Sequence, residues 1–201
     1  MNSSWRATPA ARLLGAAGSW FLFAACFTLL FQGAVVVIAL GGSCASGGPY
    51  EIAVECPDNV AAFVPLSIFG GLIAVGIALF LANGFGTPLA PWAWAILFVG
   101  LSVAFAWGGG VVGWGIFALF AVMGAVPLVI ELRANPLRTF VGSRSVRGEA
   151  FAFRGNERRG IMSDSAPREG AGTPNAGHLL TGLGIPVVAA TLGVLAGLAI
   201  F

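Results

Sequence analysis

The sequence predicts an all-α fold: a polytopic membrane bundle of five transmembrane helices, with the N-terminus inside and the C-terminus outside. The first observation behind this prediction is composition. Of the 201 residues, 58% are hydrophobic and 9% are charged, and the mean hydropathy is +0.92. Since a soluble domain carries about 25% charged residues, this chain has too little polar surface to cover a core in water. Lipid is therefore the expected solvent.

The second observation is the placement of the basic residues, which sets the predicted orientation. All ten of them are Arg. Arg6 and Arg12 precede the first apolar stretch, and the other eight lie between residues 133 and 168, before the last stretch. Basic segments stay on the cytoplasmic side during insertion, whereas the loop at 41–60 carries only acids. We therefore expect both basic segments inside and the acidic loop outside.

The first two helices are bounded by clear breaks in the apolar pattern. The first covers about Leu13 to Leu40. It is too long for a cleaved secretory signal, whose apolar region has only about 7–15 residues. The second runs from about Val60 to Ala82 and ends at the turn formers of residues 83–88.

The other three helices follow from length and turn signals. The forty residues from Pro91 to Ile130 carry no charge, and one helix of that length is far longer than a hydrocarbon core of about 30 Å. We therefore expect two helices, broken at the three glycines 108–110. The last helix runs from about His178 to Phe201, with a kink expected at Pro186.

The chain thus divides into a four-helix region (1–132), a basic inner loop (133–177) and the fifth helix (178–201). Within the loop, Ser145 to Phe153 alternates partly in polarity and is expected to form a short hairpin or to lie on the membrane surface. Residues 163–177 are small, polar and rich in Gly and Pro, which is typical of a flexible linker. Anionic lipid head groups are expected partners of the arginines in this loop. Nucleic acid is not expected, because four acids dilute these arginines.

The outer loop is expected to be closed by a disulfide between Cys44 and Cys56, the only cysteines outside the helices. The outside of a membrane is oxidising, and closing a loop of about this length stabilises a fold by roughly 3 kcal/mol. A redox-active pair is an alternative, although no second pair is present to relay electrons. Metal binding by these cysteines with Glu51 and Glu55 is another, although the ligand spacing is unsupportive and His is lacking. Unpaired thiols are a third.

The same loop offers candidate contacts to a partner. Its glycine-proline turn presents the chain's single Tyr beside acidic residues. The alternative is an acidic, solvated turn without a partner. The partner-binding candidates are Tyr50, Glu51, Glu55 and Asp58.

Small residues recur at every fourth position in three of the predicted helices. Such ladders let helix backbones approach and pack by dispersion, since lipid gives no hydrophobic drive for helix association. The ladders can serve packing between helices of one bundle. Alternatively, one ladder can face a partner protein or a second copy of the chain. The ladders are Gly70, Ala74, Ala78 and Ala82; Gly100, Ala104 and Gly108; and Ala189, Gly193 and Gly197.

The predicted membrane interior carries almost no chemistry. Coupled transporters generally place an ionisable group near the bilayer centre, whereas the mid-helix polar residues here are Gln32, Ser67, Ser102 and Thr191. No nucleophile triad, metalloprotease motif or nucleotide-binding loop is present. We therefore expect no catalytic residues, no metal and no cofactor.

The outer loop carries a resemblance to known proteins. The segment CASGGPYEIAVECP, residues 44–57, resembles a segment of uncharacterised small multi-span membrane proteins of actinobacteria. The resemblance implies a bacterial plasma membrane and carries no activity. On these grounds we expect a non-enzymatic accessory or scaffold subunit of a membrane complex, with a small transporter or permeability protein for an uncharged or lipophilic substrate as the alternative.

Overall fold

The structure is a computed structural model that describes residues 9–42, 44–45, 54–82, 86–108, 110–134, 139–140, 144–146, 149–152 and 176–201. Five helices in this part of the chain are long and apolar enough to cross a membrane, which confirms the predicted number. They are α1 (Pro9–Ala39), α2 (Asp58–Ile77), α3 (Leu89–Gly108), α4 (Gly110–Ala134) and α6 (Ala176–Ile200). A π-helical turn, η1 (Ala78–Ala82), extends α2.

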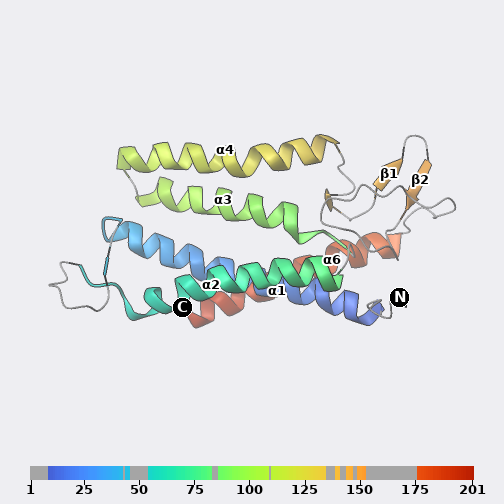
Figure 1. Cartoon of the computed structure of the whole chain (residues 1–201), viewed down its shortest axis with the longest axis horizontal. Helices are drawn as coiled ribbons and strands as arrows, with labels where there is room; N and C mark the ends of the chain where they lie inside the picture. Colours follow the sequence, from blue (N-terminus) through green and yellow to red (C-terminus); the bar gives the residue numbers. More distant parts are fainter. Residues whose placement is uncertain are drawn as a thin grey trace, which may run out of the picture.

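The helices lie side by side, so the segments between them gather at two ends of the bundle (Figure 1). The N-terminal end holds the start of α1, residues 86–88 and 139–140, and the start of α6. The opposite end holds the end of α1, the start of α2, the end of α3 and the start of α4. The first and last described residues lie at opposite ends of the bundle (Figure 1).

Glycines with positive φ lie directly after α1 and at the start of α4. After α1, Gly41 (φ 92°) and Gly42 (φ 88°) donate their backbone N–H groups to Ile38 and Val37, which closes the last turn. Gly110 (φ 55°) starts α4 directly after α3. The predicted break at residues 108–110 is therefore confirmed.

α1 is the helix on which α2, α3 and α6 pack. Gly70 of α2 lies against the Sγ of Cys26, and Gly100 of α3 lies under the ring of Phe27. Gly193 of α6 faces the backbone oxygen of Phe21. Each of these contacts is possible because glycine has no side chain, which lets the helix approach α1 closely. Close packing on α1 therefore holds this part of the bundle together.

α4 packs on α3 and makes no comparable contact with another described helix. A Cβ added to Gly124 would stand 3.0 Å from the Cβ of Phe98, and one added to Gly113 would stand 2.5 Å from the carbonyl oxygen of Phe105. The ring of Phe120 meets the rings of Phe98 and Phe105 edge to face, at centroid distances of 5.5 and 5.6 Å. Figure 1 shows α3 and α4 as a layer beside α1, α2 and α6.

Two internal prolines leave carbonyl groups that other helices and loops satisfy. A proline inside a helix has no N–H for the carbonyl four residues earlier. Pro127 thereby frees the carbonyl of Met123, which accepts from the Nε1 of Trp94 on α3 at 3.0 Å. Pro186 frees the carbonyl of Gly182, which accepts from the backbone N–H of Thr87 at 3.2 Å. Since lipid offers no donor, these bonds tie α4 to α3 and α6 to the loop before α3.

A hydrogen-bonded node closes the N-terminal end of the bundle. The Nε1 of Trp20 on α1 donates to the carbonyl of Thr87 at 3.0 Å, and the Thr87 hydroxyl donates to the carbonyl of Phe140 at 2.6 Å. The Nε1 of Trp92 donates to the carbonyl of Thr139 at 2.8 Å. The start of the basic loop is thus hydrogen-bonded to α3 through Trp92, and it is linked to α1 through Thr87.

The basic loop contains one described element beyond this node. Strands β1 (Arg144–Val146) and β2 (Glu149–Ala152) pair antiparallel, so of the two arrangements expected for residues 145–153, the structure has the hairpin. The flexible linker expected at 163–177 lies almost wholly outside the described residues.

Candidate functional site

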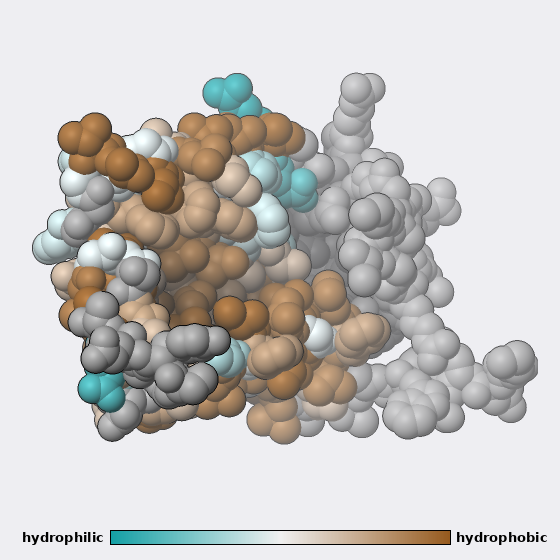
Figure 2. All heavy atoms as spheres, turned by 60° about the vertical axis from the view of Figure 1, so that its left-hand side comes forward, coloured by the Kyte–Doolittle hydropathy of each residue, from teal (hydrophilic) through white to brown (hydrophobic). Residues whose placement is uncertain are grey.

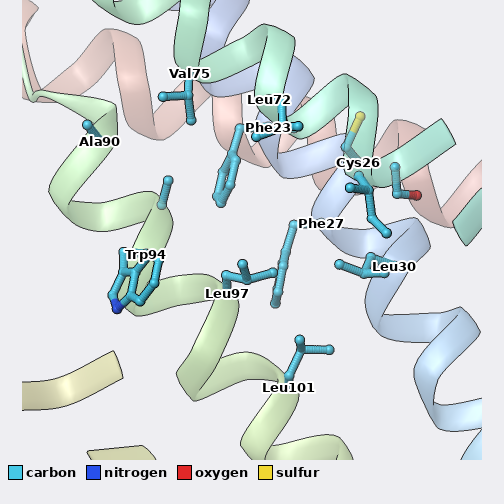
Figure 3. Close-up of a pocket in the computed structure, with 14 residues that line it drawn as sticks. Phe23, Cys26, Phe27, Leu30, Leu72, Val75, Ala90, Trp94, Leu97 and Leu101 are labelled. Carbon is cyan, nitrogen blue, oxygen red and sulfur yellow. The ribbon is translucent and has the colours of Figure 1, made fainter. Parts of the chain in front are cut away.

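The candidate site is a cavity of about 540 Å³ between α1, α2 and α3 (Figure 3). That volume is typical of sites for small molecules, which hold about 300–1,000 Å³. α1 contributes Phe23, Cys26, Phe27 and Leu30. α2 contributes Ser67, Ile68, Gly71, Leu72 and Val75. α3 contributes Ala90, Ala93, Trp94, Leu97 and Leu101.

The cavity has a closed floor and an open side. On the floor, Phe23 and Cys26 of α1 are each only 7% exposed. On the rim, Ile68 (49% exposed) and Leu72 (65%) of α2 face outward, as does Trp94 (49%) of α3. Phe23 and Phe27 point into the space between α2 and α3, and Leu97 points toward Phe27 (Figure 3). The cavity therefore opens sideways between α2 and α3, onto the surface that lipid would cover.

The core of the bundle bounds the cavity toward the N-terminal end. Trp20, Leu89 and Ala74 form a buried cluster together with Phe23 and Ala93, which also line the cavity. Beyond this cluster lies the node around Thr87. We therefore expect no path from the water at the N-terminal end into the cavity.

The polar groups at the cavity are already engaged. The hydroxyl of Ser67 donates to the carbonyl of Phe63 in its own helix, and the indole N–H of Trp94 donates to α4. The Sγ of Cys26 lies against Gly70. Among the described lining residues none is charged. The site can thus hold apolar groups by contact, and the Cys26 thiol and the Ser67 hydroxyl are the reactive groups among its described lining residues.

The outer loop is closed at its base. Cys44 and Cys56 form a disulfide with Cα atoms 5.0 Å apart, which confirms the predicted bond. Ala45 adds two backbone hydrogen bonds, to Val54 and Cys56. Of the partner-binding candidates, Glu55 is exposed and Asp58 begins α2, whereas Tyr50 and Glu51 lie outside the described residues. The disulfide and these two hydrogen bonds therefore close the loop at its base.

The small-residue ladders face inward wherever the structure describes their contacts. Ala74 is fully buried, Ala78 packs against the same core cluster, and Ala104 and Ala189 are buried. Gly197 sits over Ala25 and Thr28 of α1, as Gly193 does one turn earlier over Phe21 and Ala24. The exposure of Gly108 is not described. The described ladder positions are thus used within the chain, and a partner would have to bind another surface.

The mid-helix polar residues offer few free groups. The hydroxyls of Ser102 and Thr191 donate to carbonyls of their own helices, those of Val99 and Val187. Gln32 is half-buried on α1. No cluster of three or more metal-ligating residues is found among the residues the structure describes.

Two features of the fold were not predicted from the sequence: the α3–α4 contact and the cavity. Gly113 and Gly124 are eleven residues apart, three turns of helix, and this spacing was the available signal for the α3–α4 contact. The cavity had no such signal, because its lining comes from three helices and consists of ordinary apolar residues.

Comparison of the chain with protein-family models, with curated proteins and with solved structures finds no match in any of the three. Apolar residues dominate the described surface between the ends of the bundle (Figure 2).

Proposed function

We propose that this chain is a non-enzymatic integral membrane protein that binds an uncharged, lipophilic molecule between α1, α2 and α3. The observation that carries the proposal is the cavity of about 540 Å³, which has a buried apolar floor and a rim exposed between two helices. A charged or strongly polar ligand would leave water without finding a hydrogen-bond partner among the described lining residues, which is costly. An uncharged lipophilic molecule pays no such cost.

We place the protein in a bacterial cytoplasmic membrane, with its N-terminal end inside. The support is the arginine distribution, with all ten arginines in segments that lead to this end, and the resemblance of the outer loop to proteins of actinobacteria. The gathering of residues 86–88, residues 139–140 and the start of α6 at one end agrees with this orientation.

A cavity-filling substitution tests the proposal. Gly71 lines the cavity and Gly76 does not, although both lie on α2 and an added Cβ meets nothing within 4 Å at either. We expect Gly71→Leu to fill the cavity without a clash and Gly76→Leu to point into lipid. Both changes raise helix propensity, so loss of folding is not expected for either.

The measurement is the lipophilic material that copurifies in mild detergent, extracted with organic solvent and weighed by mass spectrometry. A species held in stoichiometric amount by the wild type and by Gly76→Leu should be depleted from Gly71→Leu. Equal extracts from all three proteins would refute binding in this cavity.

The accessory-subunit reading remains the second candidate function, and one observation favours it. α4 packs only on α3 among the described helices, and its remaining faces, including Leu119 (57% exposed), are uncovered. A photo-crosslinker on Leu119→Cys, in a Cys26→Ser background, should join a second protein in native membranes if α4 is a docking helix. The same group on Leu195→Cys of α6, equally exposed, is the control. Crosslinks to lipid alone from both positions would exclude docking through α4.

A further inference from the structure

We infer that the occupant of the cavity is one hydrocarbon chain of a membrane lipid, which enters sideways between α2 and α3 and leaves its head group outside. This inference rests on the proposed function and narrows it from lipophilic molecules in general to flexible chains. Three features of the site carry it: its shape, its opening and its lack of a polar anchor.

The cavity is elongated along the helix axes. Its lining runs from Phe23 to Leu30 on α1, from Ser67 to Val75 on α2 and from Ala90 to Leu101 on α3. At a rise of about 1.5 Å per residue, these stretches are roughly 10, 12 and 16 Å long. Half of a hydrocarbon core of about 30 Å is roughly 15 Å. The site therefore has about the length and direction of an acyl or isoprenyl chain that runs across one leaflet.

The opening faces hydrocarbon instead of water. α2 and α3 make only weak contact with each other, because each packs on α1. The exposed rim residues Ile68, Leu72 and Trp94 stand on either side of the resulting gap. A lipid chain already beside the protein can enter through this gap without crossing water, and it exchanges one apolar environment for another.

The site has no described anchor for a head group. The Ser67 hydroxyl and the Trp94 indole N–H are committed to carbonyls of Phe63 and Met123. A phosphate or sugar drawn inside would lose its water and find no described cation. A ligand with a single terminal polar group must therefore keep that group at the surface, which a lipid with one inserted chain does.

Photo-crosslinking in proteoliposomes tests this inference. We would use three probes: a phospholipid with a diazirine in the middle of one acyl chain, the same phospholipid with the diazirine in its head group, and a rigid polycyclic lipophile with a diazirine. The informative adducts are those on the floor residues Phe23 and Cys26, which are 7% exposed and beyond the reach of bulk lipid. Peptide mass spectrometry locates them.

We expect the chain probe to label the α1 floor and the head-group probe to leave it unlabelled. Gly71→Leu should reduce floor labelling by about tenfold, equivalent to about 1.4 kcal/mol of binding free energy, and Gly76→Leu should not change it. The wild-type map alone decides the matter if Gly71→Leu does not fold.

Two other outcomes are distinguishable. Floor labelling by the rigid lipophile without labelling by the chain probe, or floor labelling by the head-group probe, would overturn the single-chain inference and leave a lipophilic site in place. Absence of floor labelling by every probe would overturn this inference and the proposed function together.

Discussion

At the scale of single residues, the proline-freed carbonyl of Met123 makes Trp94 a structural residue as well as part of the cavity rim. Trp94→Phe removes the N–H that this carbonyl accepts. We expect a loss of about 1 kcal/mol, since hydrogen bonds between helices in membranes contribute about 0.6 kcal/mol on average and up to about 1.7. Reversible unfolding in mixed micelles measures it.

The control for this prediction is built into the sequence. In a Pro127→Ala background, the N–H of residue 127 can satisfy Met123, so Trp94→Phe should cost less than it does in the wild type. Trp114→Phe, at a Trp that is 59% exposed near the start of α4, should have little effect in either background. Equal losses from Trp94→Phe with and without Pro127 would show that this bond does not stabilise the α3–α4 pair.

The disulfide gives a second prediction at the same scale. Cys44 and Cys56 lie 12 residues apart in the sequence, so replacing both by Ser should destabilise the fold by about 3 kcal/mol in the chain-entropy model. Under non-reducing conditions both thiols should resist alkylation in the wild type. Alkylation of both without a reductant would mean that the loop is open in the membrane.

At the scale of elements, the glycine contacts on α1 predict a difference between two positions on α6. Gly193 faces the backbone of α1, whereas an added Cβ at Gly184 meets nothing within 4 Å. Gly193→Leu should therefore separate α6 from α1 and cost about 1–3 kcal/mol or more, whereas Gly184→Leu should be tolerated. Limited proteolysis and thermal unfolding compare them, and equal tolerance would contradict the α1–α6 packing.

Much of the element level could be predicted from sequence, because helix ends in a membrane are set by local signals. Glycines with positive φ ended α1 and separated α3 from α4 where the sequence indicated. The small-residue ladders could be recognised from the sequence as well. The helix on which they pack could not be predicted, since spacing alone does not distinguish α1 from a second chain.

The cavity escaped prediction for a different physical reason. It depends on how far α2 and α3 stand apart, and this distance follows from the way each packs on α1. The hydrogen bond from Trp94 to Met123 could be predicted only in part. Pro127 indicates in the sequence that the carbonyl of Met123 is free, but the donor is known only from the fold.

At the scale of the whole molecule, the two-ended arrangement predicts a topology that fusions can measure. Reporters inserted after residue 60 or at the C-terminus should report the outside, and reporters near residue 150 should report the inside. Because residues 86–88, residues 139–140 and the start of α6 share one end, reporters there should agree with the one near 150. The reverse pattern throughout would invert the orientation, and a mixed pattern would contradict the five-helix path.

Native mass spectrometry of the protein released from its native membrane would show whether the bundle holds one lipid chain. We predict a complex of one protein copy with one tightly held adduct in the mass range of a membrane lipid, present in Gly76→Leu and lost in Gly71→Leu. A bare protein under the same mild release, or a stoichiometric second protein with no lipid adduct, would mean that the cavity does not hold a lipid chain.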